Sequence, residues 1–243
     1  ILSAGQGRRL MPLTESIPKC CLMLDGTTLL GHQIDALMAN GIDDIVVVTG
    51  YGHPLVDEVV RQFHKPTIRT LYNPFYALSD NLGTTWVARN EMNEPFLLIN
   101  GDTLFEASTL SHLLSDRHSH SITLATDRKD AYDSDDMKVS TQGTQLLRVG
   151  KALDSAIVNG ESIGMMIFDQ AGANAFVRKV EDLMHGPKGL GRWYLSAIDE
   201  LAVAGLVGVS SIHGLGWCEV DDLNDLTQAE HTLRQWFDGL GSD

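Results

Sequence analysis

The sequence predicts an α/β fold in which helices cover both faces of a doubly wound, mostly parallel sheet. Strand-like and helix-like stretches alternate through the first half of the chain, which is the pattern of successive β-α-β units. The run IVVVTG at 45–50 is apolar and rich in β-branched residues, as in a parallel strand buried on both faces. With 243 residues and 43% hydrophobic content, the chain can build a sizeable core.

Local periodicity predicts the elements of the first half in order. A strand ends near residue 3 and a glycine-rich loop follows it. The segment 29–40 carries apolar residues at helical spacing, and Gly41 is placed to end that helix. Further helices are expected at 54–63, 84–90 and 108–116, and further strands at 68–71, 95–100 and 121–126.

The second half predicts a small antiparallel region. Two strands within 135–150 are expected to form a hairpin that turns near 142–143. The remaining expected strands lie at 162–169, 206–212 and 217–220, and the remaining helices at 171–184, 193–203 and 223–236.

Charge and cysteine content limit the function classes. The formal net charge of -14 repels a nucleic-acid backbone, so no nucleic-acid partner is expected. No apolar run approaches the ~20 residues of a membrane helix, so no membrane partner is expected. Three cysteines without a C-x-x-C pair, namely Cys20, Cys21 and Cys218, predict free thiols in a reducing, cytoplasmic compartment.

The opening loop at 2–19, LSAGQGRRLMPLTESIPK, has the composition of a polyphosphate site. Its glycines let backbone N–H groups approach an anion, and its basic side chains add positive charge. It is not a Walker A loop, and Leu10 replaces the third glycine of a dinucleotide fingerprint, which disfavours an NAD-dependent dehydrogenase. The residues concerned are Gly5, Gly7, Arg8, Arg9 and Lys19.

Two acidic motifs predict a metal site. Asp102, in NGDTLFE, follows a buried apolar strand and so lies at the mouth of the sheet. In GWCEVDD at 216–222, strand alternation places Glu219 and Asp221 on one face. Together these carboxylates predict a Mg²⁺ site completed by triphosphate oxygens. Asp222 is expected to cap the helix that follows.

These motifs together resemble the NTP-transferase family of sugar-phosphate and choline-phosphate nucleotidyltransferases. The loop resembles the family's signature opening, NGDTLFE its metal-binding motif, and GWCEVDDLNDLTQAE its second acidic motif and closing helix. The segments 72–89 and 136–139 are most similar to the phosphocholine and aminoethylphosphonate cytidylyltransferases.

The resemblance implies a Rossmann-like core with a mixed central sheet and a single domain over 1–243. Within it, 1–129 would bind nucleotide, 130–215 the acceptor, and 216–243 would supply the second acidic motif and closing helix. The implied reaction is Mg²⁺-dependent transfer of CMP from CTP, or of a nucleotide from another NTP, onto a small phosphorylated or phosphonate acceptor. A sugar-1-phosphate uridylyl- or thymidylyltransferase and a non-catalytic nucleotide sensor are the alternatives.

The resemblance also implies residue roles. Arg9, Lys19 and Asp102 would be catalytic, and Asp102 would hold the metal with Glu219 and Asp221. Trp193 and Tyr194 would form an aromatic wall for an alkylammonium group. Nucleotide would contact Ala4, Gly5, Gly7, Ser79, Asn81 and Thr84, and the acceptor's phosphate or phosphonate would meet Lys138. The family's S-N-N appears here as Ser79-Asp80-Asn81.

Overall fold

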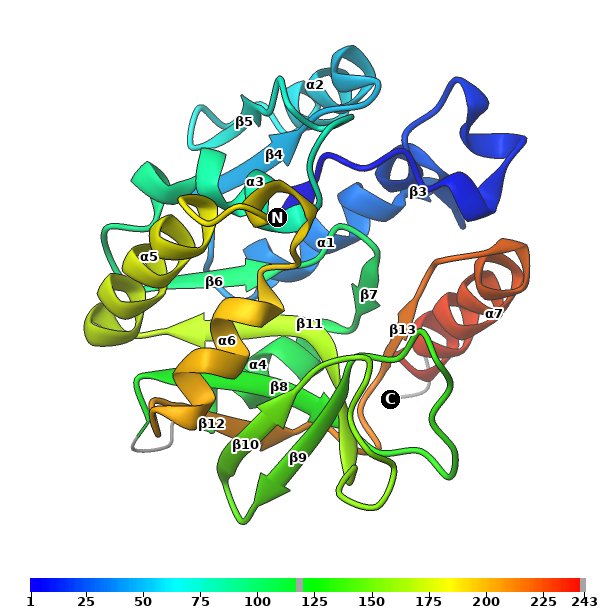
Figure 1. Cartoon of the computed structure of the whole chain (residues 1–243). Coiled ribbons are helices and arrows are strands. Elements are labelled where there is room, and N and C mark those ends of the chain that lie inside the picture. The colour runs from blue at the N-terminus through cyan, green and yellow to red at the C-terminus, as the bar shows by residue number, and fades with distance from the viewer. Residues whose placement is uncertain (117–119, 241–243) are drawn as a thin grey trace. The chain divides into compact units, whose positions relative to one another are not determined.

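The computed structural model describes residues 1–116 and 120–240 and has the predicted α/β class with mixed sheets (Figure 1). The chain forms two compact units. The first unit comprises Ile1–Ala77, Asn100–Ser111 and Leu215–Asp243, and the second comprises Leu78–Ile99 and His112–Gly214. Each unit is therefore assembled from segments that are distant in the sequence.

The first unit contains a parallel sheet of three strands in the order β1-β4-β5 (Figure 1). Leu2 lies opposite Val48, and Ile45 lies opposite Ile68. Helices α1 and α2 accompany these strands, a β2–β3 hairpin follows the opening loop, and β7 pairs antiparallel with β13. The bounds are β1 Leu2–Ser3, β2 Met23–Leu24, β3 Thr27–Thr28, α1 Leu29–Ala39, β4 Ile45–Thr49, α2 His53–Arg61, β5 Ile68–Tyr72, β7 Thr103–Phe105, β13 Trp217–Glu219 and α7 Leu223–Leu240.

The second unit contains a six-stranded sheet in the order β6-β11-β8-β12-β10-β9. Helices α5 and α6 run over one face of this sheet (Figure 1). The bounds are α3 Asn81–Val87, β6 Phe96–Ile99, β8 Ile122–Asp127, β9 Lys138–Gln142, β10 Gln145–Val149, β11 Gly160–Phe168, α5 Gln170–Met184, α6 Leu195–Val203 and β12 Val207–Ser211. Helix α4, Ala107–Ser115, begins in the first unit and ends in the second.

Parallel pairing is less extensive than predicted. In the six-stranded sheet, β8 and β12 pair in parallel, and the other pairings are antiparallel. The reason is β11, which runs against β6, β8 and β9, together with the tight hairpin between β9 and β10. That hairpin and its position agree with the prediction.

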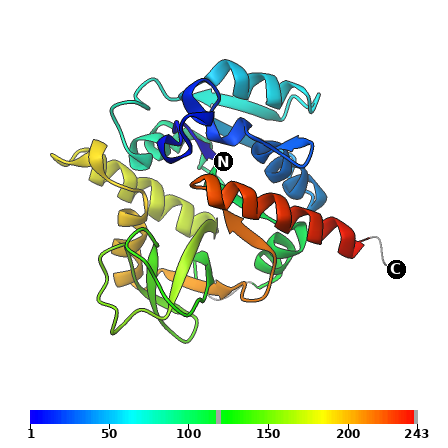
Figure 2. The same cartoon turned by 90° about the vertical axis from the view of Figure 1, so that its right-hand side faces the viewer.

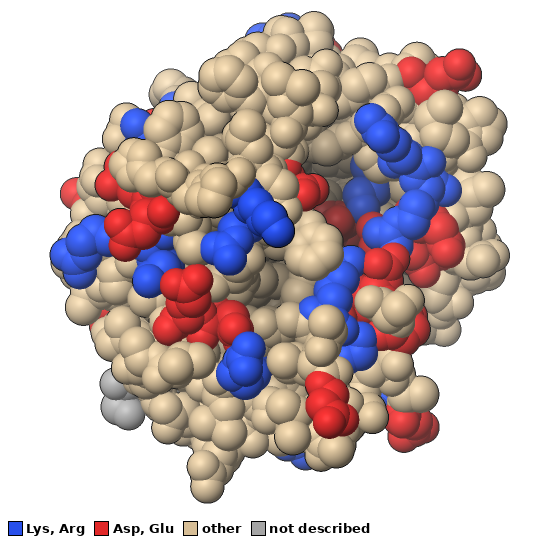
Figure 3. Space-filling view, viewed as in Figure 1, with Lys and Arg blue, Asp and Glu red and all other residues tan. Residues whose placement is uncertain are grey.

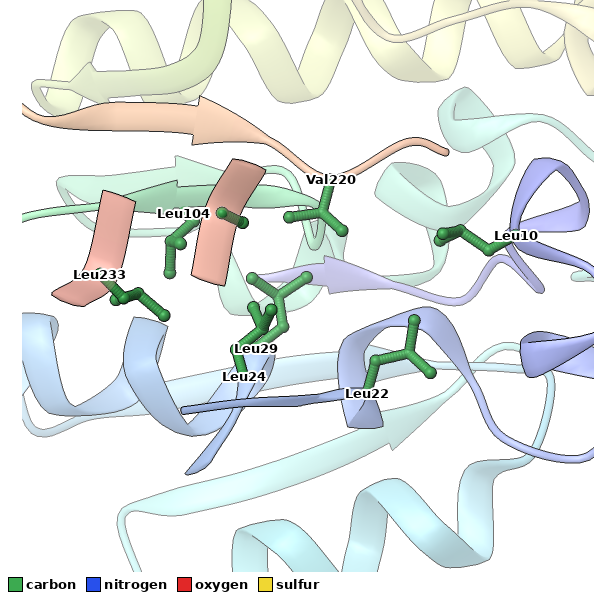
Figure 4. Close-up of a cluster of buried hydrophobic side chains, with 8 residues drawn as sticks. Leu10, Leu22, Leu24, Leu29, Leu104, Val220 and Leu233 are labelled. Carbon is green, nitrogen blue, oxygen red and sulfur yellow. The ribbon is translucent and has the colours of Figure 1, made fainter. Parts of the chain in front are cut away.

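A hydrophobic cluster in the first unit joins the elements that carry the acidic motifs (Figure 4). Leu10 of the opening loop, Leu104 of β7 and Val220 after β13 are all fully buried in it. Its other members are Leu22, Leu24, Leu29, Ala229 and Leu233. Helix α7 supplies the last two and lies beside β13 (Figure 2). Because these side chains are buried together, they fix the backbone positions of residues 9, 102 and 221, which lie beside them in the chain.

Basic and acidic side chains lie interspersed on the face shown in Figure 3. The net charge of -14 therefore does not produce a uniformly acidic face there. Cys20, Cys21 and Cys218 are free thiols, as predicted. In the described part of the chain, no helix has the length and apolar character needed to cross a membrane.

Candidate active site

Lys19 is the centre of the candidate site, and the first unit provides all of the contacts that define it. Its Nζ donates hydrogen bonds to Asp102 Oδ2 at 2.9 Å and to Asp221 Oδ1 at 2.6 Å. Arg9 Nη2 lies 2.7 Å from the second oxygen of Asp221. Sequence reasoning assigned these four residues to one site without showing that they meet, and the structure brings them together.

The two acidic motifs converge because their strands pair. Glu219 lies opposite Thr103 in the β7–β13 ladder, and the N–H of Val220 donates to the carbonyl of Asp102 at 3.0 Å. Val220 is buried, so its neighbours Glu219 and Asp221 face away from the core, as alternation predicts. Asp102 and Asp221 therefore lie next to each other at one end of this ladder.

Lys19 is only 14% exposed in its side chain, and its charge is balanced by the two carboxylates. Burial by itself lowers the pKa of Lys19, but the charges of Asp102 and Asp221 and their hydrogen bonds outweigh that effect and raise it. Lys19 is therefore a fixed cation at neutral pH.

Glycine is required where the loop passes Lys19. Gly7 has φ 74°, and a Cβ built on it would lie 2.8 Å from Lys19 Cβ. Thr14, which is fully buried, donates from Oγ1 to the carbonyl of Gly7 at 2.8 Å and holds this turn. At Gly5, in contrast, a Cβ would meet no atom within 4 Å. The backbone at Gly5 therefore borders space that a phosphate group can enter.

Sequence reasoning missed Gln33 of α1, which is 1% exposed. Its Nε2 donates to the carbonyls of Asn100 and Thr103 at 2.8 and 2.7 Å, and so holds both ends of the turn that carries Asp102. The available signal was a polar residue between Leu30 and Leu37 on the apolar face of a predicted helix.

Asp225 is a second missed residue. Its Oδ2 accepts hydrogen bonds from the N–H groups of Asp221 and Asp222 at 2.9 and 3.0 Å. Asp222 in turn accepts from the N–H of Asp225 at 3.0 Å, so it caps α7 as predicted. The pair forms a reciprocal capping arrangement that fixes the backbone of Asp221, and its D-x-x-D spacing is the signal in the sequence.

The carboxylates fit a divalent cation. Asp102 Oδ1 is buried and has no hydrogen-bond partner, which is the state of an oxygen suited to a cation. A cluster of three or more His, Cys, Asp or Glu side chains that could hold a metal ion does not occur among the described residues. Mg²⁺ typically uses only one or two carboxylates and takes its other ligands from substrate phosphates and water. Glu219 as a further ligand stays a prediction.

Ser79, Asn81 and Thr84, expected near the pyrimidine, lie in the second unit, as do the expected acceptor residues. Asn81 begins α3, and its Oδ1 accepts from the N–H of Tyr194 at 2.9 Å. Thr84 is buried, and Ser79 packs where a Cβ on Gly83 would fall, 2.6 Å from its Oγ. The helix start at Asn81 is thereby tied to the segment that carries Tyr194.

The three expected acceptor residues have different environments. Tyr194 is fully buried and packs edge-on against Phe176, with ring centroids 6.5 Å apart, so it is part of the hydrophobic core rather than of an accessible wall. Lys138 is 8% exposed, and its Nζ donates to the carbonyl of Lys151 at 3.0 Å. Trp193 is 42% exposed. Adjacent residues at the start of α6 point in different directions, which is why only one of the two aromatic rings is buried.

The profile of the MobA-like NTP transferase domain matches residues 1–204. A CMP-5'-(3-aminopropyl)phosphonate synthase from Streptomyces rubellomurinus is 25% identical over 95% of this chain and 38% of its own length. A choline-phosphate cytidylyltransferase from Streptococcus pneumoniae is 29% identical over 44% of this chain and 45% of its own length. The matches thus span less than half the length of these two relatives.

Solved structures share the fold. The inositol-1-phosphate CTP transferase from T. maritima has a TM-score of 0.80 with this chain at 22% identity. The similarity covers 96% of this chain and 93% of that one. At this level of identity, the likeness shows a common fold.

Proposed function

Because the chain belongs to the MobA-like NTP transferase family, we propose that it transfers CMP from CTP onto a small phosphorylated or phosphonate acceptor and releases pyrophosphate. The observation that carries this proposal is the contact of one buried lysine, Lys19, with the carboxylates of both acidic motifs. That group stands beside a glycine-rich loop whose backbone faces open space at Gly5.

The proposed chemistry is an in-line attack by an anionic oxygen of the acceptor on the α-phosphorus of CTP. Such an oxygen is ionised at neutral pH and needs no strong general base. The main barrier is repulsion between two anions, which Lys19 and Arg9 reduce through their fixed positive charges. Backbone N–H groups of the opening loop orient the phosphates. Asp102 and Asp221 would hold Mg²⁺, which when bound neutralises phosphate charge.

The acceptor class is supported by the relatives. The Streptomyces relative that aligns with 95% of this chain makes a CMP-phosphonate, and the Streptococcus relative is named for choline phosphate. Both names describe transfer of a cytidylyl group to a small alkyl phosphate or phosphonate. We extend that acceptor class, and cytidine as the base, to this chain.

The test is pyrophosphate release with CTP and Mg²⁺ against 2-aminoethylphosphonate, phosphocholine and a panel of sugar 1-phosphates. We expect release with a small alkyl acceptor. The Asp102→Asn variant should lose at least ~10²–10³ in rate, because it removes a preorganised electrostatic group. Asp57→Asn on α2 is the matched control, since Asp57 pairs with His53 rather than with Lys19 and its loss should keep full activity.

Two outcomes contradict the proposal. Release only with sugar phosphates, or only with UTP or dTTP, would reassign the chain to the sugar nucleotidyltransferases. Stabilisation by nucleotide in a thermal-shift assay without any pyrophosphate release would identify a nucleotide sensor. Near-normal turnover by a folded Asp102→Asn protein would refute the role of Asp102.

A further inference from the structure

Trp193 presents a fixed aromatic surface in the second unit. Its backbone carbonyl accepts hydrogen bonds from the N–H and the hydroxyl of Ser196 at 2.9 and 2.7 Å. The next residue, Tyr194, is anchored in the core and donates its N–H to Asn81. With the peptide that follows it held by these hydrogen bonds and 42% of its surface exposed, Trp193 has the geometry of a cation-binding ring.

That ring already carries a cation from the chain itself. Lys151 Nζ lies 4.8 Å from the centroid of the Trp193 ring, within the range of a cation–π contact. The same ammonium donates to Asp135 Oδ1 at 2.8 Å. Lys151 is therefore held between an anion and an aromatic face, which are the two groups that would otherwise recognise an alkylammonium ligand.

The main chain of Lys151 is held as well. Its carbonyl accepts from Lys138 Nζ at 3.0 Å, and the N–H of Gly150 donates to the carbonyl of Lys138 at 2.9 Å. The Lys151 side chain is 27% exposed, so most of it is packed. These contacts fix the start of the side chain and favour the position of its ammonium on Trp193.

We propose that Lys151 determines acceptor specificity by filling the cation site formed by Trp193 and Asp135. An acceptor with a trimethylammonium group would have to displace this ammonium, so such acceptors are disfavoured. Acceptors whose distal group is neutral or anionic meet a positive charge and are favoured. The statement about acceptors rests on the proposed function, whereas the occupied cation site does not.

The test measures cation binding without nucleotide or turnover. Tetramethylammonium is titrated while tryptophan fluorescence is recorded for the wild type, Lys151→Met and Lys151→Gln. We expect both variants to bind the probe roughly 2–30-fold more tightly than the wild type, the range given by a cation–π contact. Lys151→Arg keeps a cation on the ring and should behave as the wild type.

Two controls locate the effect. Lys179→Met removes a lysine of nearly equal exposure, 28%, which pairs with Glu200 and should leave binding unchanged. The double variant Lys151→Met with Trp193→Phe should lose most of the fluorescence change, because the chain has four tryptophans and only Trp193 is expected to report. Circular dichroism confirms that each variant is folded.

Acceptor preference is then compared by kcat/KM for phosphocholine and for 2-hydroxyethylphosphonate, whose distal group is neutral. Lys151→Met should raise the ratio of phosphocholine to 2-hydroxyethylphosphonate by a similar factor. Equal tetramethylammonium affinity in the wild type and Lys151→Met would overturn the proposal. If no acceptor is turned over, the proposed function fails, while the fluorescence titration still decides whether Lys151 fills the site.

Discussion

Replacement of Lys19 by methionine removes the cation that Asp102 and Asp221 share and keeps most of the side-chain length. The two carboxylate oxygens that contact Nζ, at 2.9 and 2.6 Å, are at most about 5.5 Å apart, and at an effective dielectric constant of about 20 two such charges repel by roughly 3 kcal/mol. Removal of one partner costs ~3–5 kcal/mol for a buried ion pair and at most ~1 kcal/mol for an exposed one. The side chains are 14–27% exposed, so we expect a loss of about 2–3 kcal/mol.

Chemical denaturation at pH 7 measures this loss directly, and thermal unfolding should show a decrease in Tm of roughly 5–10 °C. The pKa of Lys19 is raised in the fold. Its stabilisation is therefore complete below the ordinary lysine range and declines only as pH rises through the higher folded value. The difference between wild type and variant should accordingly be constant from pH 6 to 9.

Addition of Mg²⁺ should change the stability of the same variant in the opposite direction. Without Lys19 competing for the carboxylates, Mg²⁺ should bind the nucleotide-free variant more tightly than the wild type and restore part of its stability. Lys65→Met is the control, because Lys65 forms an exposed pair with Asp43 at 3.7 Å and should change stability little. Unchanged stability of Lys19→Met, or destabilisation without any response to Mg²⁺, would refute this reasoning.

Three further predictions follow from single contacts. Gly7→Ala should reduce turnover at least tenfold while the protein stays folded, because its Cβ would push Lys19 aside; normal kcat/KM would contradict this. Gln33→Met should cost about 1–3 kcal/mol in denaturation, since the buried carbonyl of Thr103 loses this donor and the part-buried carbonyl of Asn100 loses one of its donors, and a Gln33→Glu variant, which also lacks that donor, should not recover it. Burial, with the nearby charges of Asp225 and Glu219, raises the pKa of Cys218 to about 12, so iodoacetamide should label it slowly at pH 8 by mass spectrometry; fast labelling of the native protein would disprove this.

Local periodicity was sufficient for most elements, because the helices and strands of this chain bury strongly apolar faces. Helix α1 ends at Ala39, followed two residues later by the predicted terminating glycine, Gly41, at φ 75°, and the β9–β10 hairpin turns at the expected place. The pairing of β7 with β13 was not predictable, since it joins segments more than 100 residues apart. The direction of β11 was likewise invisible, because a continuous apolar run suits either orientation.

At the candidate site, the charged residues could be predicted from the sequence, but the residues that hold them in position could not. Asp102 stands out because it follows an apolar strand, and Asp221 because strand alternation places it on one face with Glu219. Gln33, in contrast, acts through two backbone carbonyls that leave no pattern in the sequence. Tyr194 is a residue that the sequence placed in the site but that lies in the core. Two adjacent aromatic residues give the same sequence pattern whether their rings bind a ligand or fill a core. For Tyr194, only the observed packing against Phe176 distinguishes these two roles.

The contact between Lys19 and Asp221 spans 202 residues, and this has a consequence for how the protein matures. A nascent chain exposes its lysine early, while one of the two counter-charges is synthesised only 202 residues later. Until then, Lys19 has at most Asp102 as its anion, and the β7 strand lacks its partner β13. Closure of so long a loop is entropically unfavourable and slow. Acquisition of the complete charge network should therefore be among the last events of folding, well after the parallel strands of the first unit have paired.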